Sequence, residues 1–232
     1  MNPITQQRDD VPKEIAVFDF DGTCISGNSP VLLVKYLLRK GQVRLSVLLR
    51  IMAWAIAYKT HLPQNEAWVR SLVFSSFEGM DKEAADAEMY QFYDDQIISR
   101  IRPKALEVMR EHIAAGRDIW IVSATFDPII VRACKDIPFN HHVATTMQVD
   151  SEGRYTREVE GHPVEGAEKL RRIEECANKV YGLGKWKLVY AYGDHYSDSP
   201  LLAAAEHPCA VTPGPTLQRL AEKEGWSVLD WK

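Results

Sequence analysis

Two aspartates directly follow an apolar run near the start of the chain. The run, residues 15–18, leads into Asp19-Phe20-Asp21-Gly22-Thr23. Such a run is typical of a buried parallel strand, and open α/β sheets carry their sites where these strands end. Because residues two apart on an extended backbone point to the same side, we expect both carboxylates to lie together. The pair suits Mg²⁺ and a phosphate ligand; the alternative is an acidic turn, because Asp-Gly is a common turn sequence.

Two further positions offer groups that bind anions. Ser123 ends an apolar run at 118–122, and its hydroxyl can hold phosphate oxygens together with the backbone N–H groups that follow, at Ala124. Lys169 offers an ammonium group that can neutralise a phosphate and position a carboxylate. Each has a structural alternative, a strand cap for Ser123 and a solvated helix face for Lys169.

A second pair of aspartates follows the apolar run at 188–192. It lies in Gly193-Asp194-His195-Tyr196-Ser197-Asp198. We expect Asp194 to complete a metal site with Asp19, and Asp198 to hold Lys169 or a metal-bound water. An acidic loop without a site is the alternative.

These four segments, taken in order, resemble the four motifs of the haloacid dehalogenase-like (HAD) superfamily. They are Asp-x-Asp-Gly-Thr at 19–23, Ser123, Lys169 and Gly-Asp-x-x-x-Asp at 193–198. The interval between the first two leaves room for an inserted helical cap, as in the phosphoserine phosphatase-like branch, subfamily IB. A looser likeness, carried by Asp-Ile-Trp-Ile-Val-Ser-Ala-Thr and an apolar stretch at 45–58, is to the bacterial phosphatidylglycerophosphatase C group.

The resemblance assigns a role to each residue. It implies a Mg²⁺-dependent phosphatase that hydrolyses a small phosphomonoester. Asp19 would be the nucleophile that forms an aspartyl-phosphate, and Asp21 would be the general acid and base. Ser123 and Lys169 would hold the phosphoryl group. Asp19 and Asp194 would bind Mg²⁺ through their side chains, and Asp21 through its main-chain carbonyl.

A count of charges supports the metal. Four ionised carboxylates and one ammonium leave three net negative charges, and a phosphate dianion would add two more. Binding such a ligand requires a divalent cation between the like charges. Mg²⁺ and one protonated carboxylate bring the empty site to neutrality, and the cation can also stabilise the transition state.

The pattern along the chain predicts an α/β fold. The resemblance implies a Rossmann-like parallel sheet with strand order 3-2-1-4-5, interrupted by an all-helical cap domain. We assign residues 13–26 and 101–232 to the core and 27–100 to the cap. Apolar periodicity and turn residues predict helices at 31–40, 45–58, 81–100, 104–115, 128–135, 165–180 and 201–205, strands at 118–123, 143–146, 188–192 and 209–211, and a hairpin of 147–149 with 155–159.

Composition narrows the classes of protein. The chain has 232 residues, 46% hydrophobic and 26% charged, with a net charge of −4, which argues against a nucleic-acid binder. The four cysteines are scattered, as expected for reduced thiols in the cytoplasm. No run is long enough for a membrane span. The apolar stretch at 45–58 instead leaves open a homodimer or a membrane-surface contact through the cap.

Other functions share part of this constellation. A haloacid dehalogenase needs the nucleophile but no general acid, so Asp21 argues against it. A phosphomutase, a lipid-phosphate phosphatase and a non-catalytic binding protein on the same core stay open. The residues just after the first motif are candidates for substrate contact, namely Cys24, Ile25, Asn28 and Ser29. His195 either faces the substrate or fills its loop.

Overall fold

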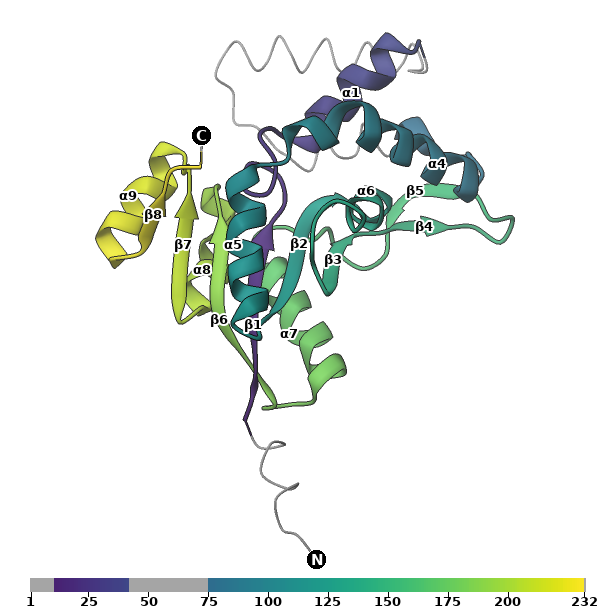
Figure 1. Cartoon of the computed structure of the whole chain (residues 1–232). Coiled ribbons are helices and arrows are strands. Elements are labelled where there is room, and N and C mark those ends of the chain that lie inside the picture. The colour runs from purple at the N-terminus through teal and green to yellow at the C-terminus, as the bar shows by residue number, and fades with distance from the viewer. Residues whose placement is uncertain (1–10, 42–74, 232) are drawn as a thin grey trace, which may run out of the picture.

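The computed structural model describes residues 11–41 and 75–231 of the chain. A six-stranded sheet forms its centre, in the order β3-β2-β1-β6-β7-β8, and every neighbouring pair is parallel (Figure 1). The predicted order 3-2-1-4-5 is confirmed, and β8 extends it by one strand. The strands are β1 Lys13–Asp19, β2 Asp118–Phe126, β3 His141–Thr145, β6 Trp186–Gly193, β7 His207–Val211 and β8 Ser227–Leu229.

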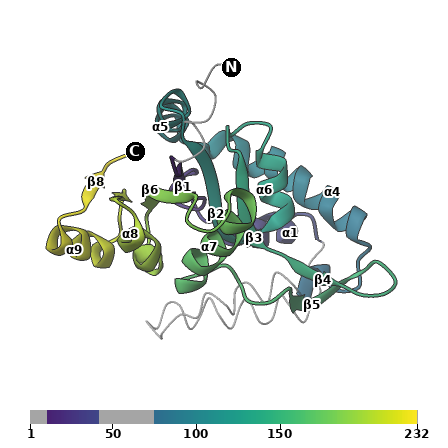
Figure 2. The same ribbon diagram turned by 90° about the horizontal axis from the view of Figure 1, so that it is seen from below.

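Helices cover both faces of the sheet. Figure 2 shows α5 on one side and α7 and α8 on the other. Strand β1 alternates between the two cores: Ala16 and Phe18 pack with the α5 side, and Ile15 and Val17 with the α7 side. A strand that is buried on both faces has a continuous run of apolar residues, so β1 could be predicted from the sequence. These helices are α5 Pro103–Ala114, α6 Asp127–Ala133, α7 Ala167–Tyr181, α8 Ser199–Ala204 and α9 Pro215–Glu224.

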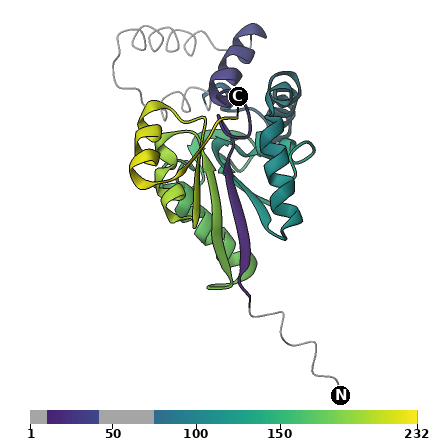
Figure 3. The same ribbon diagram turned by 60° about the vertical axis from the view of Figure 1, so that its left-hand side comes forward.

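The described parts of the predicted cap are helical. Helix α1, Ser29–Arg39, begins just after the first motif and lies beyond the carboxyl end of β1 (Figures 1 and 3). The helix predicted at 81–100 is three consecutive segments: α4 Lys82–Phe92, a π-helix Tyr93–Ile97 and a 3₁₀-helix Ile98–Arg100. The helix predicted at 45–58 lies outside the described residues.

A hairpin from the second half of the chain joins α4. Its antiparallel strands, β4 Met147–Val149 and β5 Tyr155–Val159, are those predicted (Figure 1). Tyr155 exchanges backbone hydrogen bonds with Gly79 and Met80, and its hydroxyl donates to Asp86 Oδ1 at 2.6 Å. The division into a core and a cap of residues 27–100 stays a prediction. Within the described ranges, no helix has the length and apolar character needed to cross a membrane.

A buried histidine lies between α5 and the sheet. His112 Nε2 lies 2.9 Å from the Tyr192 hydroxyl, and its Nδ1 faces Arg117, which can only donate. Nδ1 is therefore the acceptor, and the ring is neutral. Burial, and then the charge of Arg117, lower the pKa of His112 from 6.5 to about 4.

We predict that His112 destabilises the fold in acid. Its folded-state pKa is lowered, so the unfolded chain takes up the proton first, and stability present above pH 6.5 is lost as the pH falls toward 4. Between pH 7 and 5 the wild type should lose about 2 kcal/mol more than His112→Gln, which cannot titrate. Urea unfolding at both pH values measures the difference; parallel losses in the two proteins would contradict it.

Candidate active site

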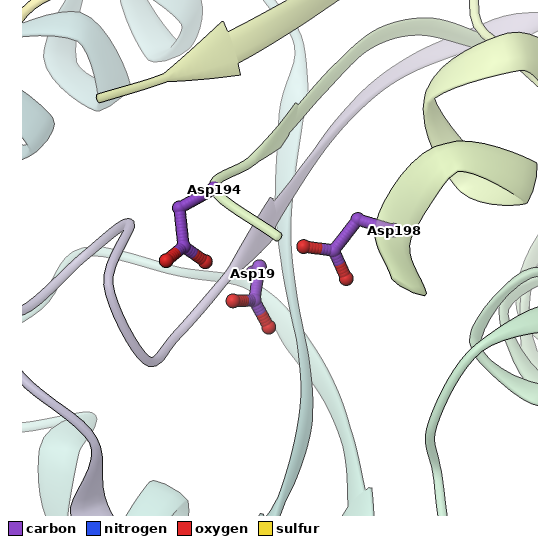
Figure 4. A group of neighbouring side chains, drawn as sticks. All are labelled: Asp19, Asp194 and Asp198. Atoms are coloured by element: carbon purple, nitrogen blue, oxygen red, sulfur yellow. The ribbon is translucent and has the colours of Figure 1, made fainter. Parts of the chain in front are cut away.

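Three aspartates meet at the carboxyl ends of two neighbouring strands. Asp19 ends β1, Asp194 follows β6, and Asp198 ends the short 3₁₀-helix Tyr196–Asp198. Figure 4 shows the three carboxyl groups converging, and one oxygen from each lies within 4.8 Å of the others. Because β1 and β6 pair in parallel, two residues 175 positions apart in the sequence come to the same edge of the sheet.

A buried lysine joins this cluster from α7. Lys169 Nζ donates to Asp19 Oδ1 and to Asp198 Oδ1, each at 2.6 Å. The side chain lies on the buried face of α7, in line with Ile173 and Ala177. The solvated-face alternative is therefore wrong, and the expectation that Asp198 holds Lys169 agrees with this contact.

The cluster carries more negative than positive charge. Burial raises the pKa of Asp19 well above its usual range; Lys169 opposes this shift, and Asp198 and Asp194 add to it. Burial and the nearby Asp198 raise the pKa of Asp194 to about 7. Burial alone would lower the pKa of Lys169, but Asp19 and Asp198 outweigh it and the pKa rises. Three hard oxygen donors with one ammonium between them fit a divalent cation, which would balance the remaining charge.

Two glycines permit the aspartates to approach the backbone. At Gly22, whose φ is +74°, an added Cβ would lie 2.0 Å from Asp194 Oδ2. At Gly193 an added Cβ would lie 2.8 Å from Asp198 Cβ and from its Oδ2. Gly22 of the first motif thus leaves space for Asp194, and Gly193 of the fourth motif leaves space for Asp198.

Asp21 has a different set of partners. Its Oδ1 accepts from the backbone N–H of Ser29 at 2.7 Å, and its Oδ2 lies 2.8 Å from the Ser29 hydroxyl. Its carboxyl group is not one of the three that cluster in Figure 4. A role of its main-chain carbonyl in metal binding stays a prediction.

Ser123 lies inside β2 and not at its end, because the strand continues to Phe126. Pairing with β3 is interrupted between Val122 and Phe126, so Ser123 and Ala124 leave the regular ladder. The buried Ser123 hydroxyl accepts from Thr125 N at 3.1 Å. This contact is the strand cap that the sequence offered as the alternative to phosphate binding by Ser123. Phosphate binding by Ser123 and Ala124 stays a prediction.

His195 makes its contacts within the loop that follows β6. Its exposed ring accepts from Ser197 N at 3.3 Å, and Asp198 Oδ2 accepts from His195 N at 3.2 Å. The two contacts are reciprocal and orient Asp198 toward Lys169. His195 thus has a structural role in its loop that the sequence left open.

The candidates for substrate contact that follow the first motif have different surroundings. Cys24, Ile25 and Ser29 are fully buried, and Asn28 caps α1 by accepting from Val31 N. Ser29 contacts Asp21. Thr125, which lies 2.7 Å from the Ser29 hydroxyl, is a site residue that sequence reasoning missed. A hydroxyl two residues after Ser123 on the same strand is the one signal that could have indicated it.

The family is settled by comparison with known sequences. The model of the haloacid dehalogenase-like hydrolases matches residues 16–203. The chain belongs to this family. A histidinol-phosphatase of Neisseria meningitidis is 28% identical over 234 residues, covering 95% of this chain and all of that protein. A phosphoserine phosphatase of Mycobacterium tuberculosis is 24% identical over 220 residues, 94% of this chain and 70% of that one.

Solved structures share the HAD fold. A Bordetella pertussis protein of unknown function has a TM-score of 0.84 at 26% identity, over 96% of this chain and 100% of that one. The phospho-aspartyl intermediate analogue of a phosphoserine phosphatase has a TM-score of 0.61 at 21% identity, over 96% and 94% of the two chains. The resemblance to the phosphoserine phosphatase-like branch is thus confirmed, and the protein is an HAD-type hydrolase.

We predict that Gly22→Ala displaces Asp194 and weakens metal binding. A methyl group there would overlap the Asp194 carboxylate. Mn²⁺ affinity, measured by electron paramagnetic resonance, should fall about tenfold or more. Gly116→Ala is the matched control, because Gly116 has a similar φ of +81° with nothing within 4 Å. It should lose about 1 kcal/mol of stability and keep its Mn²⁺ affinity. Equal affinities in the two variants would refute the close-approach argument.

Proposed function

We propose that this HAD hydrolase is a Mg²⁺-dependent phosphatase that cleaves a small phosphomonoester through an aspartyl-phosphate on Asp19. The observation that carries the proposal is the buried contact of Lys169 with Asp19 and Asp198. It orients one carboxylate at the carboxyl end of β1, where a ligand binds in sheets of this type. Asp21, two residues on, is held by Ser29, and we assign proton transfer to it.

The first half-reaction uses both aspartates of the first motif. An oxygen of Asp19 attacks phosphorus as the ester P–O bond breaks, and the leaving alkoxide takes a proton from Asp21. Lys169 holds Asp19 in place and offsets charge on the phosphoryl oxygens, which the Ser123 hydroxyl and the N–H of Ala124 also bind. Asp19, Asp194 and the Asp21 carbonyl would hold a bound Mg²⁺, which would supply positive charge to offset that of the carboxylates and the phosphate.

The second half-reaction restores the enzyme. A water oxygen attacks phosphorus and gives a proton to Asp21, the bond between phosphorus and Asp19 breaks, and inorganic phosphate leaves. Asp21 thus ends protonated, as it began. A dehalogenase has no use for this proton cycle, so the held carboxyl group of Asp21 favours phosphoryl chemistry.

Histidinol phosphate is the first substrate to test, because the relative covered over its full length is named a histidinol-phosphatase. Phosphoserine is the second. The lipid-phosphate alternative depends on residues 45–58, which lie outside the described residues. It stays a prediction, as does a homodimer or membrane contact through the cap. Vesicles containing phosphatidylglycerophosphate belong in the same panel. A phosphomutase would move the phosphoryl group to a second ester without releasing phosphate.

We predict that Asp19→Asn abolishes turnover and keeps the fold. Phosphate release from the best ester of the panel should fall about 10³-fold or more, because an amide is a poor nucleophile. Malachite-green detection of phosphate and a thermal melt measure the two properties. Asp118→Asn, at the opposite end of the sheet, is the control and should keep its activity. Substantial turnover by Asp19→Asn, with deamidation excluded by mass spectrometry, would disprove the assignment; no phosphate release by wild type from any ester would disprove the function.

We predict that chelation by EDTA removes activity and that added Mg²⁺ restores it. Asp194→Ala should reproduce the loss, because it removes a carboxylate from the cluster of three. Mn²⁺ binding by electron paramagnetic resonance gives a readout besides activity and should weaken in Asp194→Ala. Full activity in chelated wild type would contradict the metal requirement.

A further inference from the structure

Ser29 contacts both oxygens of the Asp21 carboxyl group. The backbone N–H of Ser29 donates to Oδ1 at 2.7 Å, and its hydroxyl lies 2.8 Å from Oδ2. Two contacts from one residue fix the plane of the carboxyl group as well as its position. Ser29 is fully buried, so water cannot replace either contact without a rearrangement.

A second buried hydroxyl supports the first. Thr125 Oγ1 lies 2.7 Å from Ser29 Oγ, and its side chain is 1% exposed. A hydroxyl has one proton to give. When Asp21 is ionised, Ser29 donates to Oδ2, so the proton between the two hydroxyls must come from Thr125. The three groups then form one directed chain of hydrogen bonds, in which each bond polarises the next.

Helix capping does not require the Ser29 hydroxyl. The Asn28 side chain already caps α1 by accepting from Val31 N. The N–H of Ser29 is one of the four at a helix start that lack a partner within the helix, and Asp21 satisfies it. The hydroxyl has no further task in the helix itself, so its contacts with Asp21 and Thr125 call for another explanation.

These contacts give two like-charged neighbours, Asp19 and Asp21, different partners. Asp19 turns to Lys169, and the three-carboxylate cluster that results already has excess negative charge. Asp21 is held to the first residue of α1 instead. Thr125, which lies 96 positions after Ser29 in the sequence, extends this chain of hydrogen bonds to β2.

We propose that Ser29 and Thr125 are positioning residues that hold Asp21 in the orientation for proton transfer to the leaving alcohol. The inference rests on the proposed function, because it assigns these residues to the acid and base of that reaction. It makes the orientation of the acid depend on the start of α1, whereas the nucleophile is oriented by Lys169 from α7.

Leaving groups of different basicity test the proposal. An alkyl phosphate needs its leaving oxygen protonated, whereas 4-nitrophenyl phosphate expels a stable phenolate. The ratio kcat/KM reports only the steps up to release of the alcohol, so the later hydrolysis does not enter it. Ser29→Ala and Thr125→Val should lower kcat/KM for the alkyl ester about tenfold or more, and for the nitrophenyl ester less than about threefold. Asp21→Asn sets the full size of this selective loss.

Four controls separate positioning from damage to the fold. Thr125→Ser keeps the hydroxyl and should recover most of the alkyl-ester activity. Asn28→Ala weakens the same helix start without removing a contact to Asp21, and should show no selective loss for the alkyl ester. Mn²⁺ affinity should be unchanged in Ser29→Ala. In the Asp21→Asn background, Ser29→Ala should cause no further loss with the alkyl ester.

The outcomes distinguish this inference from the proposed function. Equal losses with both esters, or no loss with either, would overturn the roles of Ser29 and Thr125 while Asp19→Asn stays inactive. If Asp19→Asn is itself active, the phosphatase mechanism fails, whatever Ser29 and Thr125 do.

Discussion

The ammonium of Lys169, buried between Asp19 and Asp198, is the interaction on which the site depends. A buried charge is tolerated only when it is paired and hydrogen-bonded, and here one cation is shared by two buried carboxylates at 2.6 Å each. Removing the lysine would leave both carboxylates without their counter-charge. The same contact joins α7, the end of β1 and the loop after β6, so the site's electrostatics and its tertiary structure are one constraint.

Two aspartates in one five-residue motif reach different environments. Burial raises the pKa of Asp19 against the effect of Lys169, and the nearby Asp198 and Asp194 add to the rise. Asp21 faces the start of α1. A nucleophile has to be ionised, whereas an acid and base has to exchange its proton, and neighbouring carboxylates acquire separate tasks when their surroundings differ. Gly22 of the same motif leaves room for the Asp194 carboxylate beside Asp19.

Sequence reasoning found strands and helices where apolar periodicity was strong and missed elements at the end of the chain. The strands ending at Asp19 and near Gly193 are buried runs, and the hairpin of β4 and β5 was found from its turn residues. It did not identify α9 and β8. Strand β8 is three residues long, Ser227 and Val228 are exposed, and its pairing with β7 is a tertiary fact without a local pattern.

The residue types and their order in the chain were sufficient to recognise four motifs that resemble those of the HAD family: an apolar run ending in carboxylates, a hydroxyl, a lysine and a second acidic loop. The contacts between these motifs could not be predicted from the sequence. Whether Lys169 lies on a solvated or a buried face of its helix depends on where α7 packs, since the charged residues around it fit either face. Which groups hold Asp21 was decided by the fold, because Ser29 and Thr125 meet only when α1 lies beyond β1 and β2. Hydrogen bonds between distant segments depend on distance and direction in space, and a linear pattern of residue types contains neither.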